Sequence, residues 1–100
     1  MIVYNISMKV TKDIEESWLR WQQEEHIPDI MSSGLFIEHK FFRLLEDDVE
    51  GSTYVVQYFA ASIENYNEYV NKVAPLLRKK AIERWGDRFI AFRSLMEVVN

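Results

Sequence analysis

The chain has 100 residues, of which 48% are hydrophobic and 28% charged, and its formal net charge is -4. This length and balance predict a single folded domain, residues 1–100, and argue against a disordered chain. The acidic balance excludes an overall basic surface for nucleic acid, and the absence of cysteine excludes a disulfide scaffold, a thiolate metal site and a cysteine nucleophile.

The first third of the chain predicts a strand followed by a helix. Apolar residues alternate with polar ones over residues 2–10, which is the period of a half-buried strand. Asp13, with Glu16 three residues later, is typical of a helix start. Pro28 lacks an amide hydrogen, so we expect the helix to bend or break there, to resume briefly and to stop at Gly34.

The middle of the chain predicts a hairpin. Residues 35–45 and 53–61 are rich in aromatic and β-branched side chains, which favour strands. The segment between them, residues 46–52, is acidic and ends in Gly51-Ser52. We expect it to form a solvated tip that joins two antiparallel strands.

The last third predicts a second helix and a final strand. Ser62 opens a segment whose apolar residues recur every three or four positions, and Gly86 closes it. Pro75 is expected to kink this helix. Residues 88–99 are again rich in aromatic and branched side chains, which predicts the last strand.

The predicted order, β-α-β-β-α-β, is that of the ferredoxin-like α+β fold. In this architecture four antiparallel strands carry both helices on one face and leave the other face bare. Strict alternation would place on the bare face the apolar residues Ile37, Phe41, Val55, Phe59, Phe89 and Leu95. So large an apolar surface is normally covered, and we therefore expect a homodimer that pairs two such faces about a two-fold axis.

Several stretches carry a resemblance that runs the length of the chain. They are residues 1–5, 18–28, 56–59, 74–78, 86–89 and 92–93. With them the chain resembles a family of similarly short bacterial proteins, a domain of unknown function in the dimeric α/β-barrel, ferredoxin-like superfamily. The resemblance implies this fold and a dimer, but no reaction. Other families of the superfamily include cofactor-independent monooxygenases, often with a histidine and a cavity between helix and sheet.

His26 is the first candidate for chemistry. It follows Glu24 and Glu25, precedes Asp29, and stands just before the predicted helix break. An imidazole among carboxylates is suited to act as a general base. The alternative is a partly exposed histidine that interacts with the dipole at a helix end.

A second group comes from strand alternation. If no bulge intervenes, the helix-free face carries the polar residues Asn5, Ser7, His39, Arg43, Gln57 and Arg93. In a barrel made of two sheets these side chains would line the interior and bind an anionic or carbonyl ligand, mainly through the arginines and the histidine. The alternative is a polar network that fixes the register of the dimer.

Other classes of site find no support in the sequence. The only two histidines, with no spaced set of carboxylates, do not form a metal-ligand pattern, and no glycine-rich phosphate loop is present. We therefore expect neither a metal nor an organic cofactor. The N-terminus lacks a basic and apolar leader, and no window is apolar enough to span a membrane, so a cytoplasmic location is expected.

The sequence thus leaves two functions open. The first is a non-catalytic homodimer that binds a small molecule or a protein partner in an accessory role. The second is a cofactor-independent, monooxygenase-like enzyme with His26 or His39 as the base and Arg43 or Arg93 holding an oxyanion. An enclosed pocket in which one histidine and one arginine converge would favour the enzyme, whereas a filled core would favour the binding module.

Overall fold

The computed structural model describes residues 1–46 and 49–100, and it confirms the expected order of elements. Asp47 and Asp48, in the middle of the predicted acidic tip, lie outside the described residues. The elements are β1 (Ile2–Thr11), α1 (Glu15–Trp21), η1 (Gln22–His26), α2 (Ile27–Met31), β2 (Glu38–Arg43), β3 (Gly51–Ala60), α3 (Ile63–Glu68), η2 (Tyr69–Val73), α4 (Ala74–Trp85) and β4 (Phe89–Glu97).

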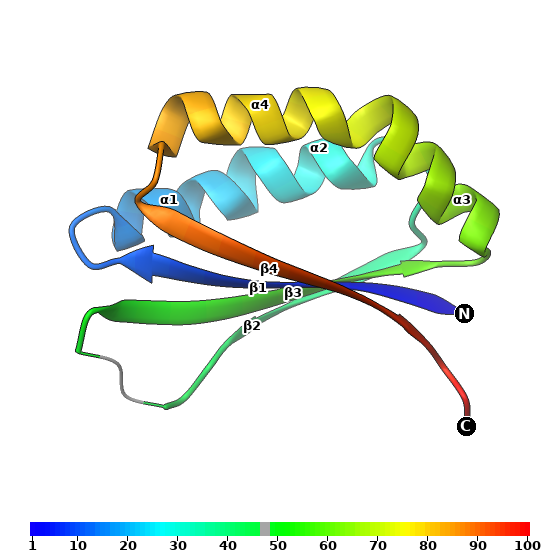
Figure 1. The fold of residues 1–100 in the computed structure, drawn as a ribbon, viewed down its shortest axis with the longest axis horizontal. Helices are drawn as coiled ribbons and strands as arrows, with labels where there is room; N and C mark the ends of the chain where they lie inside the picture. Colours follow the sequence, from blue (N-terminus) through cyan, green and yellow to red (C-terminus); the bar gives the residue numbers. More distant parts are fainter. Residues whose placement is uncertain (47–48) are drawn as a thin grey trace.

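The strands form one antiparallel sheet in the order β2-β3-β1-β4. All the helices lie on one face of the sheet, and the opposite face carries none (Figure 1). The order and the one-sided helix layer are those of a ferredoxin-like fold. The first and last strands of the order, β2 and β4, are edge strands.

The two prolines stand in similar local settings. Each follows a π-helical turn, η1 before Pro28 and η2 before Pro75. In these turns the amide of Ile27 donates to the carbonyl of Gln22, and the amide of Ala74 donates to the carbonyl of Tyr69, five residues back. The wider turn leaves room for the proline ring, which would otherwise clash with a carbonyl four residues earlier.

A bend or a break was expected at Pro28, and the break does not occur, because α1, η1 and α2 run on as one helix. The second helix changes direction between α3 and α4, near η2 (Figure 1). Its start is as expected, since the Ser62 hydroxyl accepts a hydrogen bond from the Asn65 amide at 3.2 Å. Gly34 and Gly86 both have positive φ, 75° and 61°, which suits the residue after a helix.

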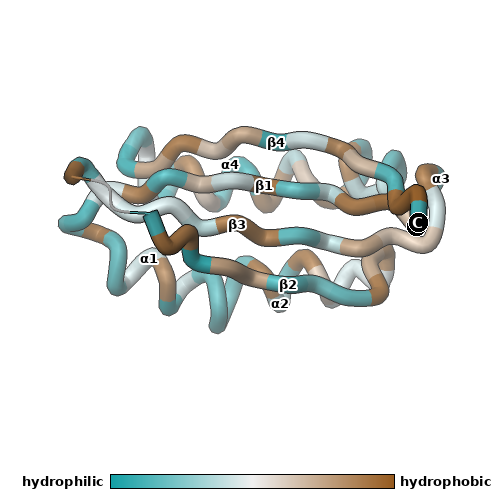
Figure 2. The backbone as a smooth tube through the Cα atoms, turned by 90° about the horizontal axis from the view of Figure 1, so that it is seen from below, coloured by the Kyte–Doolittle hydropathy of each residue, from teal (hydrophilic) through white to brown (hydrophobic). Residues whose placement is uncertain are grey.

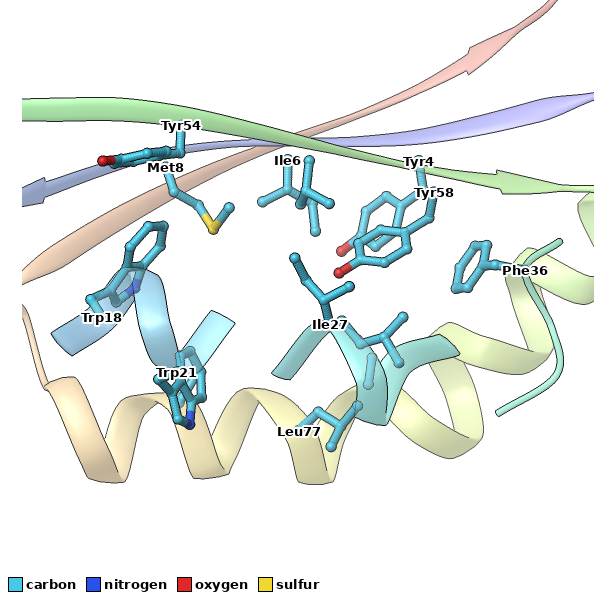
Figure 3. Close-up of a cluster of buried hydrophobic side chains, with 14 of the residues drawn as sticks. Tyr4, Ile6, Met8, Trp18, Trp21, Ile27, Phe36, Tyr54, Tyr58 and Leu77 are labelled. Carbon is cyan, nitrogen blue, oxygen red and sulfur yellow. The ribbon is translucent and has the colours of Figure 1, made fainter. Parts of the chain in front are cut away.

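The core lies between the sheet and the helices. Even-numbered residues of β1 and β3, such as Tyr4 and Tyr58, point toward the helices and are buried (Figure 3). Helix residues such as Trp18, Trp21 and Leu77 meet them from the other side. This arrangement is the one that the alternation in residues 2–10 predicts.

Strand register corrects the predicted placement of three polar residues. Residues opposite each other on a β ladder share a face of the sheet. Their partners are buried residues of β1 and β3, because His39 lies opposite Tyr58, Arg43 opposite Tyr54, and Arg93 opposite Ile6. His39, Arg43 and Arg93 therefore belong to the helix side of the sheet, and their predicted location on the bare face is wrong.

The same correction applies to some of the apolar residues. Phe41, Phe89 and Leu95 lie opposite Val56, Val10 and Tyr4 and thus face the helices, while Ile37 precedes β2. Alternation within a strand shows which residues share a face, but it does not show which face of the sheet they occupy. For β2 and β4 this depends on the length of the connections to the inner strands. The predicted placement of Asn5, Ser7, Val55, Gln57 and Phe59 on the bare face is confirmed.

Candidate functional site

A cavity of about 150 Å³ lies between the sheet and the helices. An apolar cavity of about this volume is large enough for a molecule of the size of benzene. β1, β3 and β4 form its floor, and α1, η1 and α4 form its walls. Its lining residues are Ile6, Met8, Trp21, Gln22, His26, Val56, Tyr58, Arg78, Ala81, Ile82, Phe89, Ala91 and Arg93.

Two local features of the sequence shape this cavity. The small side chains of Ala81 on α4 and Ala91 on β4 leave space where larger residues would fill the core. The π-helical turn η1 begins with Gln22 and ends with His26, and both side chains line the cavity. π-helical turns are often found at functional sites.

Two residues that line the cavity each carry a fully buried polar atom with no hydrogen-bond partner among the described residues. The two atoms are the hydroxyl oxygen of Tyr58 and the amide oxygen of Gln22. The amide nitrogen of Gln22 has only a weak acceptor, the sulfur of Met8 at 3.6 Å. Burial raises the pKa of Tyr58, so its hydroxyl is a protonated donor. Buried polar atoms are nearly always paired, and these two are therefore available to a bound molecule.

His26 lines the cavity, and its imidazole is neutral. Its ring stacks on Trp21, with centroids 4.5 Å apart and an angle of 22° between the planes. Burial lowers the pKa of His26 to about 4; Asp29 opposes this change and the charge of Arg93 adds to it. Burial therefore outweighs the neighbouring carboxylate of Asp29, and His26 is uncharged at neutral pH.

This neutral state makes the protein sensitive to acid. Because the pKa of His26 is about 4 in the folded protein and about 6.5 in the unfolded chain, the unfolded chain binds more protons between these values. The free energy of unfolding should therefore fall by on the order of 2 kcal/mol as the pH drops from about 6.5 to about 4. A His26→Phe variant should lose this part of the pH dependence in urea unfolding.

A His39→Phe variant is the matched control, since His39 is exposed and does not line the cavity. It should keep the pH profile of the wild type. An unchanged profile in His26→Phe would show that His26 is not held neutral by burial.

Two arginines stand at the cavity without an acidic partner. Arg78 donates from Nη2 to the Tyr4 hydroxyl at 3.0 Å, and Arg93 comes from the edge strand β4. Within residues 1–46 and 49–100, neither guanidinium has a carboxylate within 4.0 Å, whereas Arg88 has Asp13 at 3.9 Å. The cavity thus combines apolar walls with two guanidinium groups that have no ion-pair partner among the described residues.

The structure brings His26 and Arg93 together and separates the other predicted site residues from them. His39 lies at a different depression, with Ile27 and Phe41. Arg43 donates to the Tyr54 hydroxyl at 3.0 Å, and that hydroxyl donates to Glu15 at 2.6 Å, which ties β2 and β3 to α1.

Asn5, Ser7 and Gln57 lie on the opposite face of the sheet from the cavity. The Gln57 amide donates to the Asn5 side-chain oxygen at 3.3 Å. Three cavity residues, Gln22, Tyr58 and Arg78, do not follow from the sequence reasoning. Of the three, only Gln22 could have been found from the sequence, because a polar residue four positions after Trp18 interrupts the apolar face of the helix.

Metal and membrane features can be stated for the part of the chain that the structure describes. There, no three His, Cys, Asp or Glu side chains are grouped so that they could hold a metal ion. None of the described helices is long and apolar enough to cross a membrane.

The fold and the sheet order define a ferredoxin-like α+β protein. Residues 1–99 match the domain of unknown function DUF4286, and the chain belongs to this family. The family resemblance expected from the sequence is thereby confirmed. No curated protein matches the chain.

Solved structures share the fold at low sequence identity. An ethyl tert-butyl ether D (EthD) family protein of Bacillus halodurans has a TM-score of 0.75 at 12% identity, over 99% of this chain and 100% of that one. A dimeric ferredoxin-like protein from an uncultured marine organism has a TM-score of 0.76 at 13% identity, over 99% and 95%. SnoaB, a cofactor-independent oxygenase of Streptomyces nogalater, has a TM-score of 0.62 at 11% identity, over 99% and 94%.

Proposed function

We propose that the protein is a homodimeric module that binds a small molecule in the cavity between its sheet and its helices. One observation carries the proposal: Tyr58 and Gln22 line a cavity of about 150 Å³, and each has a buried polar atom that no group of the described residues pairs. Leaving a buried donor or acceptor unpaired costs about 1–3 kcal/mol. A ligand that pairs them would recover this energy on binding.

The bare face of the sheet supports the homodimer. Rows of residues run across this face from β2 to β4. Two rows are largely apolar, Phe42-Val55-Ser7-Phe92 and Glu38-Phe59-Val3-Met96, and the row between them is polar, Lys40-Gln57-Asn5-Ser94. Figure 2 views this face, with all helices behind the sheet. A second copy would bury the apolar rows, and the polar row would set the register of the two sheets.

Ligand binding can be tested by NMR with three benzene-sized probes that differ in polarity: toluene, benzamide and benzoate. The indole of Trp21 lines the cavity, whereas the equally buried indole of Trp18 does not. We expect at least one probe to shift the Trp21 indole signal saturably and the Trp18 signal much less. An Ala91→Leu variant, which fills the cavity, should abolish the effect. If none of the probes shifts the Trp21 signal, the proposal is wrong.

A cofactor-independent oxygenase is the second candidate, favoured by His26 and Arg93 at the same cavity, which is the pairing expected of an enzyme, and by the fold shared with SnoaB. A base with a pKa of about 4 is weak at neutral pH, and the binding module is therefore the better-supported function. Oxygen uptake in the presence of 1-naphthol should be no faster with the protein than without it. Oxygen uptake that depends on the protein and is lost in His26→Phe would make the oxygenase the better-supported function.

A further inference from the structure

We infer that the cavity selects a small aromatic carboxylic acid, with its carboxylate held by Arg78, Arg93 and the Tyr58 hydroxyl and its ring among the apolar walls. The inference rests on the proposed function and adds the chemical class of the ligand. It follows from the way polar and apolar groups are distributed along the cavity.

The positively charged groups gather at one end of the cavity. Tyr58 lies opposite Tyr4 in the sheet, and the two hydroxyls point together from the sheet toward the helices (Figure 3). Arg78 donates to the Tyr4 hydroxyl, and Arg93 lies opposite Ile6, two residues along β1. Tyr58, Arg78 and Arg93 therefore all line the cavity toward this end.

Tyr69 gives a second indication that the two arginines converge. Burial and the neighbouring Tyr4 raise the pKa of the Tyr69 hydroxyl, and the charges of Arg78 and Arg93 both oppose the rise. Both guanidinium groups are therefore within electrostatic range of the same hydroxyl.

The charge of the ligand follows from the missing partners. Among the described residues neither guanidinium has a carboxylate within 4.0 Å, and His26 beside them is uncharged, so an anion can approach both arginines without displacing an ion-pair partner. A planar carboxylate suits the fork of an arginine side chain, and it can also accept from a tyrosine hydroxyl. A neutral ligand would forgo these charge-assisted hydrogen bonds.

The opposite end of the cavity can hold the aromatic ring of the ligand. Met8, Trp21 and Phe89 line it, and the polar groups there are the amide of Gln22 and the uncharged imidazole of His26, which stacks on Trp21. The unpaired oxygen of Gln22 can accept a hydrogen bond from a donor on the far side of the ring. A 4-hydroxyl group is such a donor, so 4-hydroxybenzoate should bind more tightly than benzoate.

Benzoate and benzamide test the charge, because they have nearly the same shape. Their dissociation constants are measured by NMR titration of the Trp21 indole signal in the wild type and in Arg78→Met, Arg93→Met and Lys80→Met. Lys80 is an exposed cation on the same helix as Arg78 and does not line the cavity, so its variant is the matched control. Arg93 is exposed, and its replacement should leave the fold intact.

We expect benzoate to bind at least about tenfold more tightly than benzamide, as charge-assisted hydrogen bonds imply. The ratio should fall toward one in both arginine variants and remain unchanged in Lys80→Met. Equal binding of the two probes to the wild type, or a preference that survives in both arginine variants, would overturn the inference and leave the proposed function standing. No binding of any probe, toluene included, would overturn both.

Discussion

Two variants on the same strand, Tyr58→Phe and Tyr54→Phe, are expected to change stability in opposite directions. In the ligand-free protein the Tyr58 hydroxyl is buried and unpaired, so its removal should raise the free energy of unfolding by about 1 kcal/mol. The Tyr54 hydroxyl is bonded to Glu15 and Arg43, so its removal should lower the free energy of unfolding by about 2 kcal/mol. Urea unfolding followed by circular dichroism measures both.

The two variants should also differ in ligand binding. Tyr58→Phe should weaken the binding of benzoate about tenfold, because a donor to the carboxylate is lost. Tyr54 does not line the cavity, and its variant should bind benzoate like the wild type. A gain in stability at the expense of binding is the mark of a group retained for function. If Tyr58→Phe destabilises the protein as much as Tyr54→Phe does, the Tyr58 hydroxyl has a structural partner and the argument for the site fails.

Replacement of Phe92 by arginine should have the largest effect on assembly. Phe92 is 67% exposed in the single chain and lies in an apolar row of the bare face. Two copies of the variant would bring an unpaired positive charge into each half of the interface, which costs several kcal/mol. We expect the dissociation constant of the dimer to rise at least about 100-fold, as measured by sedimentation equilibrium.

Leu76 provides the control for this experiment. It is 58% exposed on α4, on the helix side of the sheet, and Leu76→Arg should leave the dimer intact. The dimer proposal would be contradicted by a wild type that is monomeric at micromolar concentration. It would also be contradicted by a Phe92→Arg variant that associates as tightly as the wild type.

Much of the fold could be predicted because its signals are local. Alternation in residues 2–10, the cap at Ser62 and the glycines at 34 and 86 each act over a few residues, and the structure keeps all of them. The continuity of the helix through Pro28 could not be predicted, because the π-helical turn that accommodates the ring has no simple sequence pattern.

The site was harder to predict because it depends on register between strands. A shift of β4 by one residue relative to β1 moves Arg93 from the bare face to the helix side. Alternation within β4 is compatible with both placements. Tyr54 and Tyr58 both lie on the buried face of β3, and no sequence pattern distinguishes the unpaired hydroxyl of Tyr58 from the paired hydroxyl of Tyr54. Only the three-dimensional arrangement shows that the chain leaves Tyr58 without a partner.

Native mass spectrometry of protein purified gently from cells tests both the dimer and the ligand, because one spectrum reports the number of subunits and any retained small molecule. We expect a dimer that carries one defined low-mass acid per subunit, and we expect the acid to be lost from Arg93→Met. A monomer without bound mass, from a preparation that is folded by circular dichroism, would contradict this expectation.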